Sequence, residues 1–321
     1  MSEIQRIAIV GTGVIGTGWA LRYLANGYEV SAWDPVPGFG KRLQEDCERH
    51  WSVMERTGLA SGASLSRLHI AGSMAEACAE ADWVQESAPE NLTIKRSLHQ
   101  QIESCCAGET ILASSSSGLL PSEIQSALRH PERFIIAHPF NPVYLLPLVE
   151  LVPGQQTDDR VVVRAKSFQA SMNMHPLVVR KEIEGYLSDR LQEALWREIL
   201  HLVNDGIATT EELDDAIVYG PGLRWALMGT CLTFHLAGGE GGMRHMLEQF
   251  GPALKLPWTK LEAPELNEQL IEAMVAGTAK QADGRSIAAL ESLRDDCLIE
   301  IMRALKKYEV GAGQLLKRAS D

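Results

Sequence analysis

Two polar residues lie in a stretch of sequence that otherwise looks buried. In AHPFNPVYLLPLVEL, residues 137 to 151, His138 follows one apolar run and Glu150 lies inside a second, twelve positions later. Burying either group without a hydrogen-bond partner is costly, so each needs one. A histidine held by a carboxylate is a typical general base, because the pKa of imidazole lies near neutral pH. The alternative from spacing alone is a structural histidine bonded to a backbone carbonyl.

A second group of residues indicates nucleotide binding. IAIVGTGVIGTGWA carries Gly11, Gly13 and Gly16 as G-x-G-x-x-G, directly after an apolar run and at the start of a helical pattern. Such glycines allow a tight turn and let the N–H groups of the helix start, here at Val14 and Ile15, approach a pyrophosphate. Asp34 ends the next predicted strand, where an acid binds the ribose hydroxyls of NAD and repels the 2′-phosphate of NADP. The alternative is a structural βα turn followed by an Asp-Pro turn.

The elements that position these residues alternate between strand and helix patterns in the first half of the chain. The predicted strands are RIAIV, YEVSAW, WVQES, TILAS, RFIIA, LPLVELV and HPLVVRK. This alternation predicts an α/β, Rossmann-type doubly wound and mostly parallel sheet, with His138 at its carboxyl edge, where such folds bind ligands.

Past Gly185 the strand patterns stop and only helical patterns follow. We therefore predict an NAD-binding domain over residues 1–184 and an all-α substrate and dimerisation domain over 185–321. Thr209 and Glu212 have capping-box spacing, and LRWALMGTCLTFHLA is predicted to be helical.

Composition narrows the classes of function. The 321 residues are 45% hydrophobic and carry a net charge of −12, which argues against a nucleic-acid partner. Six cysteines are scattered without C-x-x-C pairs and are predicted to be reduced thiols. No signal-peptide pattern or membrane-length apolar run is present, so we predict a cytoplasmic protein without a membrane partner. We predict no metal site.

The ordered motifs VGTGVIGTGWA, VQESAPENLTIKRSLHQQI, ILASSSSGL and RFIIAHPFNPVYLLPLVEL resemble those of the 3-hydroxyacyl-CoA dehydrogenase superfamily over nearly the whole chain. The resemblance implies NAD as cofactor, His138 as catalytic base, Glu150 as its orienting partner, Ser117 as donor to the substrate oxygen and Asn141 as a supporting residue. Family membership also implies a homodimer joined through the helical domains.

The resemblance places Glu90 and Lys95 along the nicotinamide ribose. An exposed pair on a solvated helix face is the alternative for these two residues. For the serines at 114 to 117, the alternative is capping of the helix expected from Pro121.

Two departures argue against a coenzyme A thioester. The stretch from Lys41 to Arg67 has no lysine after Lys41, where acyl-CoA enzymes carry lysines that meet the coenzyme A nucleotide. Asp189, in GYLSDR, replaces the motif asparagine that faces the histidine in the family. An acid in the first turn of a helix, where it complements the helix dipole, is the alternative for Asp189.

The helical half resembles most closely the subgroup of carnitine 3-dehydrogenases and, more distantly, gulonate 3-dehydrogenase and lambda-crystallin. This implies L-carnitine as the small-molecule substrate, oxidised at its 3-hydroxyl. Aromatic faces suit a quaternary ammonium. The candidates for the substrate site are Asp189, Tyr186, Trp225 and Phe234, although most helix aromatics are core residues. The remaining alternatives are a gulonate or other short 3-hydroxyacid dehydrogenase, a crystallin-like NADH-binding structural protein and, last, a coenzyme A enzyme.

Overall fold

A computed structural model describes residues 4–261 and 267–310. By its internal contacts the chain divides into two compact units, one up to Gln192 and one from Glu193. The predicted boundary between residues 184 and 185 lies a few residues earlier and stays a prediction. Each unit is described by itself.

The described residues of the first unit form an eight-stranded sheet with the order β3-β2-β1-β4-β5-β6-β7-β8. All neighbouring strands are parallel except β6 and β7. The strands are β1 Arg6–Val10, β2 Glu29–Trp33, β3 Leu68–Ile70, β4 Trp83–Glu86, β5 Ile111–Ser114, β6 Phe134–Pro139, β7 Leu148–Pro153 and β8 His175–Val178. The predicted fold class is confirmed. The short β3 was missed because its three residues are too few to show a period of two.

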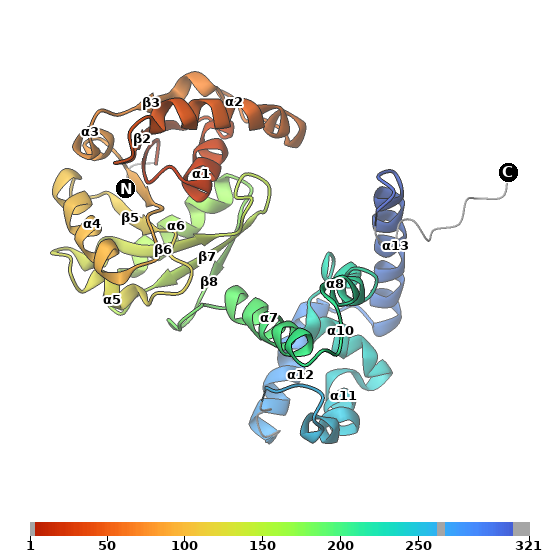
Figure 1. Ribbon diagram of the computed structural model, residues 1–321. Helices are drawn as coiled ribbons and strands as arrows, with labels where there is room; N and C mark the ends of the chain where they lie inside the picture. Colours follow the sequence, from red (N-terminus) through yellow and green to blue (C-terminus); the bar gives the residue numbers. More distant parts are fainter. Residues whose placement is uncertain (1–3, 262–266, 311–321) are drawn as a thin grey trace. The chain divides into compact units, whose positions relative to one another are not determined.

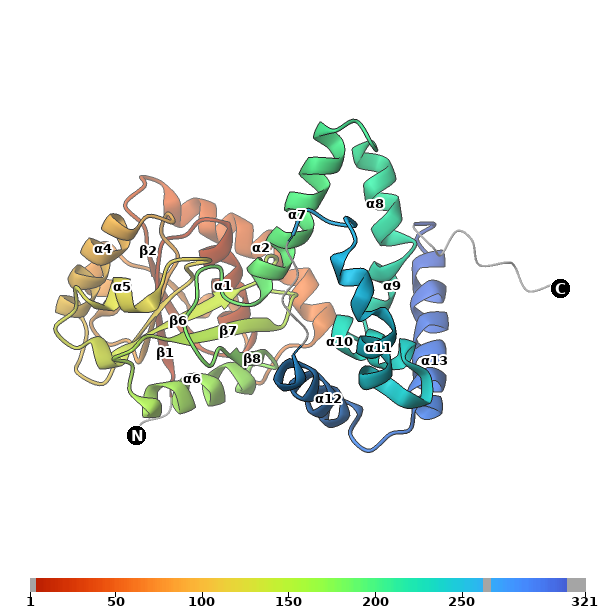
Figure 2. The same cartoon turned by 90° about the horizontal axis from the view of Figure 1, so that it is seen from below.

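Helices cover both faces of this sheet, as Figures 1 and 2 show. Alternate strand residues face opposite sides, and the two apolar clusters divide accordingly. Ile7 and Ile9 pack with α1 and α6 on one face, whereas Ala8 and Val10 belong to the cluster of α3, α4 and α5 on the other. The helices are α1 Val14–Ala25, α2 Phe39–Thr57, α3 Met74–Cys78, α4 Leu92–Cys105, α5 Pro121–Gln125 and α6 Asp159–Ser171, with 3-10 turns at Leu65–Arg67 and Pro131–Arg133.

The reversal between β6 and β7 decides where the predicted pair lies. Residues 140–147 contain no helix, so the chain cannot cross over to a parallel position and returns antiparallel. In this register His138 lies directly opposite Glu150. Directly opposed residues project from the same face of a sheet, so the two side chains are brought together by the strand pairing itself.

The described part of the second unit is helical. Its helices are α8 Thr210–Val218, α9 Pro221–Trp225, α10 Thr230–Ala237, α11 Gly242–Phe250, α12 Glu268–Ala282 and α13 Ile287–Lys306, with 3-10 turns at Gly239–Gly241 and Gly251–Lys255, and α7 Ser188–Asn204 runs into it from the first unit. The predicted capping box of Thr209 and Glu212 is confirmed. The stretch LRWALMGTCLTFHLA, predicted to be helical, is helical except for a break: α9 ends at Trp225 and α10 begins at Thr230, with Gly229 as its N-cap. Among the described residues no helix combines the length and the apolar character needed to span a bilayer.

Candidate active site

His138 and Glu150 form a buried hydrogen-bonded pair. His138 Nδ1 lies 3.0 Å from Glu150 Oε2, and Glu150 is 0% exposed. An ionised carboxylate can only accept, so the proton of the neutral ring sits on Nδ1 and leaves the lone pair on Nε2. The pair therefore presents one free basic nitrogen, away from Glu150.

The other oxygen of Glu150 is held by the start of α7. Oε1 accepts hydrogen bonds from the backbone N–H groups of Leu187 and Ser188, each at 3.0 Å. The N–H groups at a helix start have no partner within the helix, so they suit an anion. Burial by itself would raise the pKa of Glu150, but the hydrogen bonds from His138 and the two backbone groups outweigh it and lower that pKa.

Tyr186 forms the wall beside the histidine. Its ring meets that of His138 edge-on, with the centroids 5.6 Å apart, and its hydroxyl donates to the carbonyl of Leu119 at 2.8 Å. Burial raises the pKa of Tyr186, which keeps the phenol neutral. The side chain is fully buried, so it positions the imidazole and does not present a face to solvent.

Asp189 approaches the free nitrogen of His138. Its Oδ2 lies 3.8 Å from Nε2, while its Oδ1 accepts from the side-chain amide of Gln192 at 3.2 Å. The Asp189 side chain is 28% exposed. It also lies in the first turn of α7, as the helix-dipole alternative requires.

The serine loop, residues 114 to 118, is held by Glu90. Glu90 Oε1 accepts from Ser116 Oγ at 2.6 Å and from the N–H groups of Ser117 and Gly118 at 3.0 Å. These serines do not cap the following helix: the N-cap of α5 is Leu120. Ser117 is exposed, and no hydrogen bond of its hydroxyl is found within residues 4–261 and 267–310. Asn141 is likewise exposed, in the turn after β6.

The glycine loop, residues 11 to 16, has the shape that a dinucleotide requires. Gly11 has φ +96°, and a Cβ there would come within 2.6 Å of the carbonyl oxygen of Ser87. A Cβ on Gly16 would come within 1.9 Å of the carbonyl oxygen of Gly11, whereas Gly13 faces open space. Within the described residues no side chain caps α1, whose first turn contains Val14 and Ile15. This helix start is therefore available to a phosphate.

Asp34 is joined to this loop by hydrogen bonds. Its Oδ2 accepts from the N–H of Thr12 at 2.7 Å and its Oδ1 accepts from the N–H of Val36 at 2.9 Å. Both oxygens keep further lone pairs, so the carboxylate fits a pair of ribose hydroxyls at the mouth of the loop.

Lys95 belongs to a buried ionic network that the sequence did not indicate. It is 1% exposed, donates to Glu86 at 2.8 Å and to the carbonyl of Ala88 at 3.1 Å, and lies 3.7 Å from Glu90 Oε2. Glu86 is also bonded to His99 and Ser114. Burial alone would raise the pKa of Glu86, but His99 and Lys95 outweigh it and hold that pKa at about 2. The alternative of an exposed Glu90–Lys95 pair therefore holds for Glu90 only, because Lys95 is buried.

The network residues missed from the sequence carried one usable signal. Glu86 is a single charged residue at the end of a buried strand, as Glu150 is within β7. The backbone donors at Leu187 and Ser188 gave no sequence signal, because every residue except proline supplies an N–H group.

Trp225 and Phe234, the other two aromatic candidates, belong to the second unit and are about half exposed.

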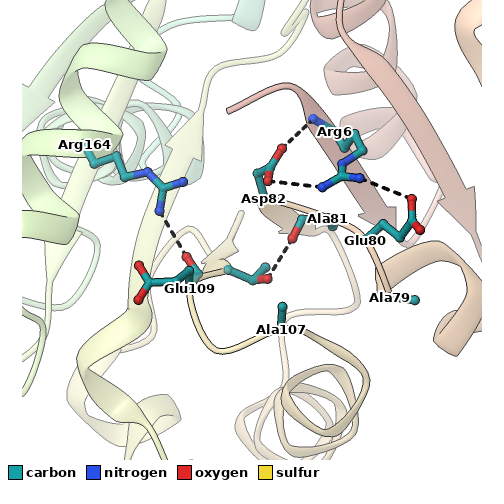
Figure 3. A pocket seen from close by; sticks show the side chains of 9 residues that line it. Arg6, Ala79, Glu80, Ala81, Asp82, Ala107, Glu109 and Arg164 are labelled. Atoms are coloured by element: carbon teal, nitrogen blue, oxygen red, sulfur yellow. Dashed lines mark hydrogen bonds and ion pairs between the residues drawn. The ribbon is translucent and has the colours of Figure 1, made fainter. Parts of the chain in front are cut away.

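A hollow of about 240 Å³ lies at the opposite edge of the sheet, where β1, β4 and β5 begin. Arg6 pairs there with Glu80 at 3.2 Å and with Asp82 at 3.8 Å, and Arg164 donates to the carbonyl of Glu109, as Figure 3 shows. These contacts tie the starts of the strands together. The hollow is remote from His138, which stands at the carboxyl edge.

Two family models match the chain. The NAD-binding domain of 3-hydroxyacyl-CoA dehydrogenase matches residues 6–183, and the C-terminal domain of the same enzyme matches residues 185–285. The chain belongs to the 3-hydroxyacyl-CoA dehydrogenase family. It is an NAD-dependent dehydrogenase, as the resemblance implied, and the glycine loop and Asp34 fit that cofactor.

Relatives within the family are similar over nearly their full length. The L-carnitine dehydrogenase of Pseudomonas putida is 52% identical over 313 residues, which cover 98% of each chain. That of Oceanobacillus iheyensis is 53% identical over 305 residues, covering 95% of this chain and 99% of the relative. A solved structure of 5-formyl-3-hydroxy-2-methylpyridine 4-carboxylic acid 5-dehydrogenase, an NAD+-dependent dismutase, is 26% identical with a TM-score of 0.74 and covers 94% of this chain and 99% of its own.

Proposed function

We propose that this dehydrogenase oxidises the 3-hydroxyl of L-carnitine to 3-dehydrocarnitine. The observation that supports this substrate is the 52% sequence identity, over 98% of both chains, to an L-carnitine dehydrogenase. The departures in the sequence agree with it, since the stretch from Lys41 to Arg67 has no lysine after Lys41 to meet a coenzyme A nucleotide.

In this proposal His138 is the general base. Its Nε2 takes the proton of the substrate hydroxyl, because Nδ1 is occupied by Glu150. Glu150 holds the ring in one tautomer and stabilises the imidazolium that forms, while Leu187 and Ser188 hold Glu150 itself. NAD, when bound, accepts the hydride that leaves the carbinol carbon.

Ser117 is proposed to bind the substrate oxygen. The backbone of the serine loop is fixed by Glu90, so the Ser117 hydroxyl stands on a positioned loop and is itself exposed. Asn141, in the turn that follows His138, is proposed as the supporting residue. Glu90 and Lys95 are proposed to border the cofactor, with Glu90 as the exposed member of the pair.

Trp225 and Phe234 stay predictions for the trimethylammonium group. They are aromatic and partly exposed, as a cation–π site requires. Tyr186 is a weaker candidate than the sequence indicated, because its ring is buried against His138.

We also infer a homodimer formed through the helical unit. Trp196, Leu200 and Val203 lie at i, i+4 and i+7 on α7, hence on one face, and each is 40% exposed or more. A row of large apolar side chains in contact with water favours burial against another surface. The cytoplasmic location stays a prediction from composition.

The test of the proposed function is a substrate screen with purified protein and NAD. L-carnitine, gulonate, a short 3-hydroxyacid and 3-hydroxybutyryl-CoA are compared by the initial rate of NADH formation. L-carnitine should have the highest kcat/KM. Faster oxidation of gulonate would assign the sugar-acid alternative, and NADH binding without turnover of any of them would assign the crystallin-like one.

A further inference from the structure

Asp189 sets a second carboxylate at the working nitrogen of His138. The two nitrogens of the ring face two different acids: Nδ1 faces Glu150 at 3.0 Å and Nε2 faces Asp189 Oδ2 at 3.8 Å. Glu150 is fully buried, whereas Asp189 is partly exposed. A hydroxyl that gives its proton to Nε2 must come within about 3 Å of that nitrogen. It therefore comes next to the Asp189 carboxylate as well.

The start of α7 already has an anion without Asp189. Its first N–H groups, at Leu187 and Ser188, already donate to the ionised Glu150, which supplies the negative charge that a helix start favours. Gln192 turns Asp189 by binding Oδ1, which leaves Oδ2 as the oxygen closest to the histidine. The carboxylate is thus aimed at the place of reaction.

The charged groups around Tyr186 and His138 are mainly acidic. Glu90, Glu150 and Asp189 all act electrostatically on Tyr186, whose ring lies against His138. Lys95 is paired with Glu86, so it does not offset them in full. A substrate with a positive group beside its hydroxyl gains from this arrangement, and one with a negative group there is repelled.

We propose that Asp189 is the specificity-determining residue that reads the positive charge of the substrate. This inference rests on the proposed function. In L-carnitine the ammonium nitrogen is three covalent bonds from the hydroxyl oxygen, and the carboxylate stands on the other arm of the carbinol carbon. The ammonium arm points toward Asp189 and the carboxylate arm points away, so the acid also fixes which face of the carbinol is presented.

The test combines a change of residue charge with a change of substrate charge. Asp189→Asn removes the negative charge at constant shape, and the tert-butyl isostere 3-hydroxy-5,5-dimethylhexanoate, of the same spatial arrangement at the carbinol, removes the positive charge of L-carnitine. Wild type should prefer L-carnitine by about tenfold or more in kcat/KM, a difference of about 1.4 kcal/mol. Asp189→Asn should lose most of that preference. Its kcat/KM for L-carnitine should fall, whereas its kcat/KM for the isostere should stay within about threefold of the wild-type value.

Two further variants control the experiment. Glu184→Gln removes a negative charge from the exposed segment just before α7 and should keep the preference. Asp189→Glu retains the charge and should restore part of it, and thermal melting of each variant checks the fold. An equal loss with both substrates would show that Asp189 acts only through His138, and would overturn the inference.

Failure of the proposed function gives a different result. If wild type does not oxidise L-carnitine, the proposed function is wrong. The same comparison is then made with a cationic and a neutral form of the 3-hydroxy substrate that the protein does oxidise. An Asp189→Asn variant that leaves the preference of that pair unchanged would overturn the inference about Asp189 itself.

Discussion

At the scale of single residues, the two nitrogens of His138 are not equivalent. Nδ1 is bonded to a carboxylate that is itself held by two backbone donors, and Nε2 is the free base. His138→Ala should lower kcat by about 10²- to 10⁴-fold, since that is the usual contribution of a general base. The affinity for NADH, measured by fluorescence titration, should stay near that of wild type.

Glu150→Gln should also lower kcat, because one amide oxygen cannot accept from His138, Leu187 and Ser188 as a carboxylate does. His130→Ala is the control, since that histidine is exposed on the same unit. Retention of most activity by His138→Ala would make His138 a structural residue.

At the scale of elements, two glycines of the glycine loop are predicted to have different roles: Gly16 is needed for packing and Gly13 for binding. Gly16→Ala should destabilise the protein by about 1 to 3 kcal/mol, because its Cβ would meet the backbone of Gly11. Gly13→Ala should leave the free energy of unfolding nearly unchanged, since nothing lies within 4 Å of that Cβ. It should weaken NADH binding, because the methyl group stands at the uncapped helix start. Urea denaturation and NADH titration measure both; equal stability of the two variants would contradict the packing role.

The network between β4 and α4 makes a second prediction at this scale. Lys95→Met should cost about 3 kcal/mol or more, because it leaves the fully buried Glu86 without its nearest cation. Lys41→Met is the matched control: Lys41 is 84% exposed and pairs with Glu45 on the surface, so its loss should change stability by less than about 1 kcal/mol. Similar urea midpoints for the two variants would show that the network contributes little.

The same network makes the free energy of unfolding depend on pH in the acidic range. The pKa of Glu86 is about 2 in the folded protein and about 4.3 in an unfolded chain, so its contribution is complete above that unfolded value and is lost as pH falls toward 2. Between pH 5 and pH 2, the free energy of unfolding of wild type should therefore fall by up to about 3 kcal/mol more than that of Glu86→Gln. Parallel curves for the two proteins would mean that Glu86 titrates normally.

At the scale of the whole molecule, the helical unit keeps much apolar surface in contact with water. Among the described residues of this unit the buried cluster is small, with Met228, Leu236, Ala282 and Leu290, whereas Trp196 on α7 is 51% exposed. We expect light scattering to show a dimer, and Trp196→Glu combined with Leu200→Glu to shift it toward monomer, because a buried charge opposes association. Val163→Glu, 65% exposed on α6 of the first unit, should leave the mass unchanged. A monomeric wild type would refute the proposed dimer.

Sequence by itself determined the fold class, the glycine loop with Asp34, and the pairing of His138 with Glu150. Each of these depends on a local period or on a fixed spacing along one or two neighbouring elements, which a linear pattern records. The burial of Lys95 was not readable, because it depends on where α4 lies against β4 and on the acid that β4 happens to end with. The break between α9 and α10 was not predicted, because the residues between Trp225 and Thr230, apart from Gly229, suit a helix.

Only the tertiary structure decided what surrounds the histidine. Folding brings Leu187 and Ser188 to Glu150, Tyr186 against the ring and Asp189 to Nε2, although these four residues lie about fifty positions after His138 in the chain. Such contacts depend on the return of the chain after β8 and on the direction in which α7 begins. No local pattern carries that direction, since a backbone N–H is the same for every residue type except proline. Sequence thus named the base and its partner, and the packing of α7 added the second acid.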